Sequence, residues 1–504
     1  MRVNERKAGV FLSYMQMFIG VISMLFYTPV MLRLMGQSEY GIYNLASSVI
    51  SYLSLFNLGF TSSYMRFYMK YKSENDEDGI KRVNGTFLLI FIGIMLLTFV
   101  AGAFITFNAH MFFDKNLTAE ELFKTKVVMG IMVFNMGIIF PAYIFSAYLR
   151  AHEKYVFQRG MQLIKTIVNP FVMLPVLFLG GKSIGMAIVT AIISIAMEYS
   201  FVLYSLFKLK MRFSFKNIRF REIGAVGKFS VFVFLNMMFD HLNSSVDNIL
   251  LGIYHGTTAV AIYGVAMHLR MYLVTFSTSI QSVFVPEIHK LANAGKNREL
   301  TYLFTKVGRI QFFILAMLTI GFVFFGKEFI LMWSGREYEE AYLITLILFI
   351  IAIPSAIQLI GEEIQRAKNL HHYRTFVYGT VVIANVLISI PLCKQYGILG
   401  CTVGTAISTI VGKGICMGFV YHLKLKLDMI FFWKEILKIL PGLIIPFVVG
   451  LVMMLFAPLD NFATFLCCGM LFVIVYCLSV WFISFNSYEK SLLTGVVKKV
   501  LKKK

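Results

Sequence analysis

Long apolar segments follow one another along almost the whole chain, and no other feature limits its fold as strongly. A helix rises about 1.5 Å per residue, so about 20 apolar residues cross the hydrocarbon core of a bilayer. Only 14% of the 504 residues are charged, against about a quarter in a soluble protein. We therefore predict an all-α polytopic membrane protein of about fourteen transmembrane helices, over residues 9–35, 41–68, 84–107, 126–149, 157–179, 183–207, 228–252, 257–287, 302–325, 341–365, 373–393, 397–423, 435–457 and 462–485.

The net charge of +21 has a topological explanation. Most of the 47 lysines and arginines fall in alternate loops, which indicates a cytoplasmic side. These loops are 2–7, 66–82, 150–159, 208–221, 290–306, 366–374, 424–438 and 490–504. An even number of spans then places both termini in the cytoplasm. We expect no nucleic-acid partner, and we expect the basic tail to contact anionic membrane lipid. The first apolar segment lacks a small-residue cleavage site, so we expect it to be retained.

Short patterns recur between the two halves of the chain. Gly36-x5-Ile42-Tyr43-x2-Ala46 returns as Gly256-x5-Ile262-Tyr263-x2-Ala266, and Gly185-x4-Thr190-Ala191-Ile192 returns as Gly400-x4-Thr405-Ala406-Ile407. The repeated patterns occur in the same order in both halves, and both copies of each pattern lie at the same place in a helical hairpin. They predict two six-helix bundles that are parallel repeats, a transporter signature, plus a C-terminal helix pair. The expected domains are a first lobe 1–210, a cytoplasmic linker 211–227, a second lobe 228–425, the helix pair 426–486 and a basic tail 487–504.

Charged residues interrupt the two spans between Lys228 and Lys290. Asp240 and His241 stand near the middle of the first span, and His268 and Arg270 near the middle of the second. A charge at the bilayer centre costs roughly 2.5–3.5 kcal/mol even on an insertion scale, and it persists where it faces a bundle interior or a wet cavity. This pattern predicts a polar site inside a helical membrane bundle.

Four stretches carry a resemblance to a known family: Leu34–Tyr43, Asp247–Gly252, Ala261–Ala266 and Trp333–Tyr342. With two six-helix lobes and a last pair, the sequence resembles the multidrug/oligosaccharidyl-lipid/polysaccharide exporter superfamily. Within it, the chain is most similar to the Wzx-type oligosaccharide flippases. The resemblance covers nearly the whole chain, but its motifs belong to the scaffold and do not name a substrate.

The resemblance implies alternating access and export of a polyprenyl-diphosphate-linked glycan across a bacterial cytoplasmic membrane for cell-surface polysaccharide synthesis. Its expected partners are that lipid-linked glycan, a coupling H+ or Na+, and the polysaccharide polymerase machinery. Two alternatives on the same scaffold stay open, a lipid II-type flippase and a drug/cation antiporter. The expected cavity lies between the helices over 9–35, 41–68, 228–252 and 257–287.

Arg270 with His268 is the first candidate for binding the diphosphate, because a guanidinium matches phosphate oxygens with a bidentate fork. A structural ion pair between Arg270 and Asp240 is the alternative, and the two interpretations can coexist. Lys413, between Gly412 and Gly414, is a second cationic candidate, and its small neighbours predict close helix contact.

Two further cations could bind substrate. Arg33 lies at the end of the first predicted span, where rim binding and snorkelling explain it equally. Lys165 lies inside a first-lobe helix, and a structural pair with Glu198 is its default explanation.

Asp240 and His241 are candidates for ion coupling, because acids and imidazoles relay protons in transporters. Asp247 and Glu198 are weaker candidates; Asp247 belongs to a scaffold motif and has a structural explanation. Glu362 and Arg366 are four residues apart, and we expect them to form a local ion pair within one helix. Arg309 is expected to snorkel at a helix end, and most tyrosines of residues 14–71 are expected to form an interfacial belt.

An enzyme is a weaker interpretation. The expected external loops are short, and the sequence holds no HExxH, Walker A or CxxC motif. Its six cysteines lie mostly in apolar runs without metal-site spacing. We therefore expect no catalytic residue, no metal and no cofactor.

Overall fold

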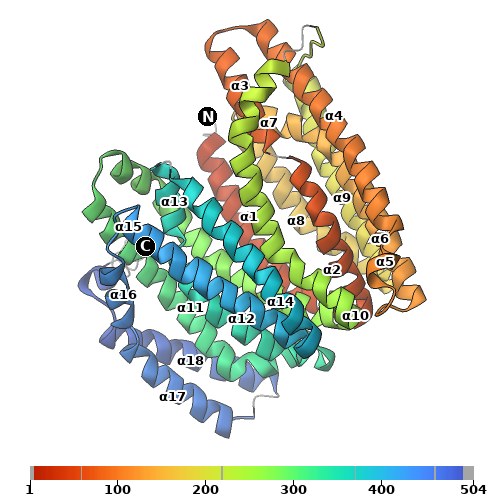
Figure 1. Cartoon of the computed structure of the whole chain (residues 1–504). Helices are drawn as coiled ribbons and strands as arrows, with labels where there is room; N and C mark the ends of the chain where they lie inside the picture. The colour runs from red at the N-terminus through yellow and green to blue at the C-terminus, as the bar shows by residue number, and fades with distance from the viewer. Residues whose placement is uncertain (1–4, 58, 217–219, 369, 459–460, 492–504) are drawn as a thin grey trace, which may run out of the picture. The chain divides into compact units, whose positions relative to one another are not determined.

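The computed structural model describes residues 5–57, 59–216, 220–368, 370–458 and 461–491, and within these ranges every regular element is helical (Figure 1). The helices form two compact units. The first unit runs to Gly264 and includes Ser389–Cys401, and the second contains Val265–Ile388 and the chain from Thr402 on.

In the described part of the first unit, nine helices precede the long helix α10. They are α1 (Glu5–Met35), α2 (Gln37–Ser51), α3 (Phe60–Ser73), α4 (Glu77–Phe107), α5 (His110–Phe113), α6 (Ala119–Ile139), α7 (Tyr143–Ala151), α8 (Tyr155–Phe178) and α9 (Lys182–Leu203). Short segments η1 (Tyr52–Asn57), η2 (Phe140–Ala142) and η3 (Tyr204–Lys208) follow α2, α6 and α9.

Helix α10 (Phe220–Asn293) and helix α14 (His371–Ser408) each contribute to both units. The other helices of the second unit are α11 (Asn297–Trp333), α12 (Ala341–Ala356), α13 (Ile360–Ala367), α15 (Met417–Leu423), α16 (Met429–Leu437), α17 (Pro441–Phe456) and α18 (Phe462–Ile483). The short segment η4 (Arg336–Tyr338) precedes α12, and the π-helical segment η5 (Thr409–Cys416) follows α14.

Ten helical stretches in the described chain are long and apolar enough to cross a membrane, or eleven if α16 and α17, which meet at a bend of 40°, form one span. Two of these stretches, Ser245–Asn293 and His372–Leu423, each cover parts of two predicted spans. The chain is therefore an all-helical, multi-span membrane protein, which confirms the predicted fold class at this level.

Glycine breaks divide the two longest helices. Gly256 in α10 has φ 78° and ψ −170°, and Gly397 in α14 has φ 61°. Gly36, which precedes α2, has φ 77° and ψ 165°, nearly the conformation of Gly256. A residue with a β-carbon rarely adopts this region. A Cβ on Gly256 would also lie 2.7 Å from the carbonyl oxygen of Asn116. Gly36 and Gly256, which begin the two copies of the first repeated pattern, thus have nearly the same backbone conformation.

Glu39 joins three helices of the first unit. Its carboxylate accepts from the Lys124 ammonium at 2.7 Å and from the hydroxyl of Ser183, at the start of α9, at 2.5 Å. Burial alone would raise the pKa of Glu39, which precedes the predicted span 41–68, but these hydrogen bonds lower the pKa below its ordinary value. Glu121, three residues before Lys124 on α6, accepts from the Thr257 hydroxyl at 2.6 Å. These two carboxylates therefore connect the ends of α2, α6 and α9 with the part of α10 that follows Gly256.

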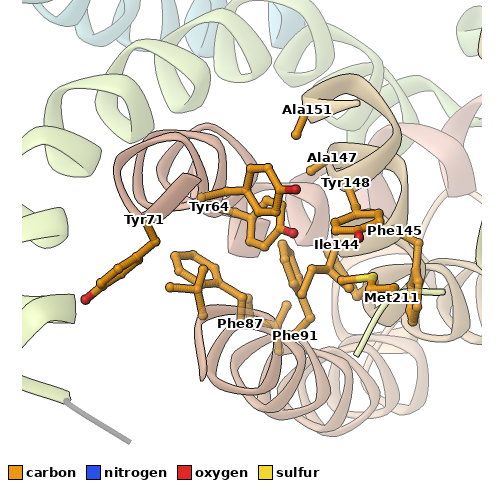
Figure 2. Close-up of a cluster of buried hydrophobic side chains, with 14 residues drawn as sticks. Tyr64, Tyr71, Phe87, Phe91, Ile144, Phe145, Ala147, Tyr148, Ala151 and Met211 are labelled. Atoms are coloured by element: carbon orange, nitrogen blue, oxygen red, sulfur yellow. The ribbon is translucent and has the colours of Figure 1, made fainter. Parts of the chain in front are cut away.

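An aromatic cluster fills the space between α3, α4, α7 and the segment after α9 (Figure 2). Tyr64 packs edge-on against Phe87 and donates to Asn84 Oδ1 at 2.8 Å. Asn84 in turn donates to the carbonyl of Arg212 at 2.8 Å, so the first part of the predicted linker is docked on α4. The expected interfacial belt is wrong for Tyr64, which is fully buried because its hydroxyl finds a partner in the core.

The last helix pair packs on α11 of the second unit. Tyr476 of α18 donates to the carbonyl of Phe313 at 2.8 Å. Arg309 of α11 binds both oxygens of Glu489, at 2.6 and 2.9 Å, and the carbonyl of Ser484 at 2.9 Å. The expected snorkelling of Arg309 is therefore wrong: its side chain is 3% exposed, because a carboxylate beyond α18 pairs with it.

Candidate functional site

A cavity of about 190 Å³ lies in the second unit, among α10, α12, α13, α14, η5 and α15. Three lining residues are basic and come from distant parts of the sequence: Arg270, Arg374 and Lys413. Glu362 is the acidic residue of the lining, and the aromatic ones are Tyr378 and Tyr421. Two of the predicted substrate-binding residues, Arg270 and Lys413, thus line the same cavity.

Tyr378 holds two of the three cations. The guanidinium carbon of Arg374 lies 4.6 Å from the centre of its ring, and the Lys413 ammonium 4.8 Å from the same centre. Arg374 and Tyr378 are four residues apart on α14 and therefore share one face of that helix. A cation above an aromatic ring gains about 0.5–2 kcal/mol. The ring brings two positive charges close together without supplying a negative charge.

Glu362 faces the cavity from α13. It accepts from the Tyr378 hydroxyl at 2.9 Å and forms an ion pair with Arg374, whose Nη2 lies 3.3 Å away. The predicted local pair between Glu362 and Arg366 is wrong, because Arg366 instead pairs with Glu363 at 2.7 Å. Arg366 is solvent-exposed, whereas Glu362 lies on the face of α13 where a phenol and a second arginine are within reach.

The backbone around Lys413 departs from α-helical geometry. Lys413 lies in the π-helical segment η5, and single π-turns are frequent at functional sites. Gly412 has the close helix contact that the sequence predicted, since a Cβ there would overlap the side chain of Val381. Gln358 donates to the carbonyls of Pro354 at 2.9 Å and Gly414 at 3.4 Å. These contacts fix the turn from which Lys413 enters the cavity.

Arg270 and His268 have different environments. Arg270 is half-buried and lines the cavity, whereas His268 is exposed. Positions two apart point to nearly opposite faces of a helix, so the two side chains do not form one binding pair in this structure. The side chain of Asp240 lies outside the described residues, and its predicted pairing with Arg270 stays a prediction.

The remaining cationic candidates lie in the first unit. Lys165 of α8 donates to Ser194 Oγ of α9 at 3.0 Å, and Glu198 stands one turn further along α9 and is half-buried. Arg33 is exposed in the last turn of α1.

Two of the candidates for ion coupling in α10, Asp247 and His241, have polar neighbours in the first unit. Asp247 is 2% exposed and accepts from the Tyr263 hydroxyl at 2.5 Å, which joins the two arms of α10 across Gly256. This contact agrees with the structural role that the scaffold motif suggested. His241 is half-buried, with Nε2 3.3 Å from Ser54 Oγ.

Sequence reasoning missed Arg374, Tyr378 and Glu362 as members of the site. Arg374 was counted among loop cations, and Glu362 was assigned to a local pair. The available signal was the spacing of Arg374 and Tyr378, which puts a cation and an aromatic ring on one helical face. Chemically, the lining is suited to an anionic ligand, because it holds three cationic side chains and one carboxylate.

Known proteins similar to this chain include a probable flippase and a capsular polysaccharide biosynthesis protein. Over 173 residues it is 22% identical to the probable flippase AglR of Haloferax volcanii, a match to 34% of this chain and 36% of AglR. Over 226 residues it is 24% identical to the capsular polysaccharide biosynthesis protein CapF of Staphylococcus aureus, covering 44% and 56%. The chain spans about a third of AglR and just over half of CapF. It is also 20% identical over 406 residues to the uncharacterized membrane protein EpsK of Bacillus subtilis, covering 79% of each.

Solved structures establish the fold. The lipid II flippase MurJ in an inward closed conformation superimposes with a TM-score of 0.71 at 17% identity, covering 96% of this chain and 100% of MurJ. An inward-facing multidrug resistance transporter of the MATE family gives 0.64 at 14% identity, covering 84% and 99%. The chain therefore shares its fold with MurJ and with MATE transporters, as the resemblance predicted. A family model described as polysaccharide biosynthesis protein matches residues 30–343, and the chain belongs to that family.

Proposed function

We propose that the chain is a flippase that moves a polyprenyl-diphosphate-linked oligosaccharide across a bacterial cytoplasmic membrane for cell-surface polysaccharide synthesis. The observation that carries the proposal is the convergence of Arg270, Arg374 and Lys413 on one cavity of a multi-span protein. A lining with three cationic side chains and one carboxylate favours an anionic ligand over a cationic one.

The size of the cavity supports a headgroup site. About 190 Å³ is small beside the roughly 300–1,000 Å³ of pockets that enclose a drug-sized ligand. A diphosphate would occupy this space, while the glycan and the prenyl chain would extend from it. Arg374 lies near the start of α14, next to the basic loop that we assign to the cytoplasm. The cavity would therefore meet the headgroup of a lipid that arrives from the cytoplasmic leaflet.

The architecture that we propose has fourteen spans, with both termini in the cytoplasm. The matching conformations of Gly36 and Gly256 support two parallel six-helix repeats. Transport would follow alternating access, with the two bundles rocking about the midplane. In this scheme Arg33, Lys165 and His268 are secondary substrate contacts, and a further cavity lies between the helices over 9–35, 41–68, 228–252 and 257–287.

Ion coupling through Asp240 and His241 is part of the proposal, with Asp247 and Glu198 as weaker candidates. His241 has a hydroxyl neighbour, Ser54, which can exchange a proton with an imidazole. The change Asp240→Asn should weaken the response of flipping to a proton or sodium gradient. An unchanged response would leave Asp240 with a structural role alone.

A drug/cation antiporter is the alternative, and the charge of the cavity disfavours it. An organic cation placed among Arg270, Arg374 and Lys413 would be repelled. The experiment that separates the two is a flipping assay in proteoliposomes. A fluorescent polyprenyl-diphosphate oligosaccharide is reconstituted with the full chain, and the outer-leaflet label is quenched with and without an ion gradient.

We expect protein-dependent flipping by the wild type and its loss in Arg270→Ala. The matched control is Arg366→Gln, whose exposed side chain pairs with Glu363 outside the cavity lining; it should flip at the wild-type rate. Flipping by Arg270→Ala at the wild-type rate would remove Arg270 from the site. Exchange of drugs or cations without any lipid movement would establish the antiporter instead.

A further inference from the structure

The loop 108–125 contacts the break in α10. It joins two predicted spans on the side opposite the basic loops, which we assign to the exterior. Asn116 Nδ2 donates to the carbonyl of Ile253 at 2.5 Å. The carbonyl oxygen of Asn116 lies 2.7 Å from the place that a Cβ on Gly256 would occupy. The loop therefore touches α10 on both sides of the turn that Gly256 permits.

The two carboxylate oxygens of Glu121, in the first turn of α6, have separate partners. Oε2 accepts from the backbone N–H of Thr118 at 2.9 Å and from its hydroxyl at 3.1 Å, as in a capping box. Oε1 accepts from the Ser38 hydroxyl at 2.5 Å and from the Thr257 hydroxyl at 2.6 Å. One oxygen thus caps α6, and the other joins α6 to α2 and α10.

Ser38 and Thr257 occupy corresponding places in the two halves of the chain. They lie two and one residues after Gly36 and Gly256, which begin the two copies of the first repeated pattern. Ser38 belongs to the first predicted lobe and Thr257 to the second, and both belong to the first compact unit. A Cβ on Gly41 would overlap the carbonyl of Thr257. The start of α2 and the part of α10 after its break are therefore in direct contact.

Glu39, the neighbour of Ser38, makes a different kind of contact. It accepts from Lys124 and Ser183, and all three residues belong to the first predicted lobe. A motion of one lobe against the other leaves these hydrogen bonds intact. The hydrogen bond from Thr257 to Glu121 joins the two predicted lobes, so a motion that separates them at this end must break it.

Further along α2, a row of polar side chains faces the first part of α10. The facing pairs are Ser48 with Asn248 at 2.9 Å, Ser51 with Ser245 at 3.3 Å, and Ser54 with His241 at 3.3 Å. The Ser51 hydroxyl also donates to the carbonyl of Ser48 at 2.7 Å, and the Ser54 hydroxyl to the carbonyl of Ser51 at 2.6 Å. Because these two hydroxyls keep an acceptor on their own helix, separating the row leaves them satisfied.

We propose that Glu121 is an external latch between the two predicted lobes, and that its hydrogen bond from Thr257 breaks each time the external side opens. The inference rests on the proposed function, because alternating access opens the two sides in turn. Hydroxyl donors suit a contact of this kind. Glu121 is half-buried, so water can replace a departing hydroxyl, whereas breaking a fully buried ion pair leaves a charge without compensation.

The first test locks the contact. The Oγ atoms of Ser38 and Thr257 are 3.4 Å apart, so the paired variant Ser38→Cys with Thr257→Cys brings two thiols together. The full chain is reconstituted into proteoliposomes and oxidised with copper phenanthroline, and flipping of the fluorescent polyprenyl-diphosphate oligosaccharide is measured. We expect the disulfide to stop flipping and dithiothreitol to restore it. Each single variant keeps the six native cysteines and should not respond to the oxidant.

The second test does not depend on flipping. Ser48 is 7% exposed, and Ser48→Cys serves as a reporter of external opening. Spheroplasts that express the full chain are treated with a membrane-impermeant maleimide, and the label above that of the parent is followed with time. Adding Thr257→Val should raise the labelling rate about tenfold, because a hydrogen bond to a charged acceptor is lost. Thr118→Val removes a hydroxyl from the other oxygen of Glu121 and is the matched control, which should label at the parental rate.

A further variant checks the side of the membrane. Lys115 is exposed in the same loop, and Lys115→Cys should be labelled in every background. Absence of that label would place the loop on the other side and overturn an external latch. If Thr257→Val fails to reach the membrane, Ser38→Ala removes the other donor to the same oxygen and must raise the labelling rate in its place.

The outcomes separate the latch from the flippase proposal. Flipping that continues after the disulfide has formed would overturn the latch and leave the flippase standing. If the disulfide does not form, equal labelling rates in Thr257→Val and Thr118→Val would overturn the latch. A wild type that flips no lipid, with faster labelling in Thr257→Val, would overturn the lipid substrate and support the latch in a transporter of another substrate.

Discussion

Tyr378 donates a hydrogen bond from its hydroxyl to Glu362 and contacts two cations with its ring, so one side chain positions both signs of charge in the cavity. The ring and the hydroxyl can be separated by substitution. The hydroxyl orients a carboxylate, and the ring holds Arg374 and Lys413 within 4.6 and 4.8 Å of its centre.

Tyr378→Phe should keep flipping of the diphosphate-linked lipid within about threefold of the wild type, because the ring remains and a hydrogen bond contributes about 1 kcal/mol. Tyr378→Leu should lower it by about tenfold or more, because two cation–π contacts are lost. Initial flipping rates at matched protein density would measure both. Equal rates for the two variants would show that the ring does not position the cations.

Arg309→Ala should destabilise the second unit by roughly 3–5 kcal/mol, because it leaves the buried carboxylate of Glu489 without its cation. The double variant Arg309→Met with Glu489→Leu should recover much of that loss, since it removes both charges. Denaturation in detergent, followed by tryptophan fluorescence, would measure the free energy of unfolding. A double variant no better than Arg309→Ala would mean that packing, and not the ion pair, is lost.

Gly256→Ala should lower the stability more than Gly36→Ala. Both glycines have positive φ in a region that costs a residue with a β-carbon about 1–3 kcal/mol. Only at Gly256, of these two, would the new methyl also meet the carbonyl of Asn116. Thermal unfolding midpoints of the two variants provide the comparison, and equal losses would exclude the contribution of that contact.

The stability of the first unit should fall in acid through Glu39. Its pKa is lower in the folded state than the ordinary value of 4.5, so the folded state favours the ionised form. The resulting stabilisation is complete above pH 4.5 and is lost as the pH falls through the folded pKa. Glu39→Gln should show a smaller fall of the unfolding midpoint between neutral pH and pH below 4.5. Identical pH profiles would assign the acid sensitivity to other carboxylates.

The hydropathy pattern predicted the fold class because membrane helices must satisfy their backbone within each segment, and length alone then reveals them. It also singled out Arg270 and Lys413, because a cation inside an apolar run is costly wherever it lies. The residues that complete the cavity do not interrupt an apolar run, so the hydropathy pattern did not reveal them. Arg374 and Glu362 stand near helix ends, where charge is ordinary, and only the tertiary fold brings Glu362 of α13 to Tyr378 and Arg374 of α14.

Distance along the chain also limited the prediction. Arg309 and Glu489 are separated by 180 residues, and nothing in the local sequence of either indicates the other. The same is true of the docked linker, whose carbonyl at Arg212 is reached from Asn84. Local patterns identify which side chains are costly to bury, whereas the partner that offsets the cost is fixed by the tertiary fold.

The pairing of Arg309 with Glu489 also sets an order of events during synthesis. A ribosome that adds about 5–20 residues per second takes roughly ten to forty seconds to travel the 180 residues between them. Throughout that interval the guanidinium has been made and its bidentate carboxylate has not. A chain that stops after α18 but before Glu489 would contain α1–α18 and still lack this partner. The second unit therefore gains the stability that this ion pair contributes only when synthesis has passed α18.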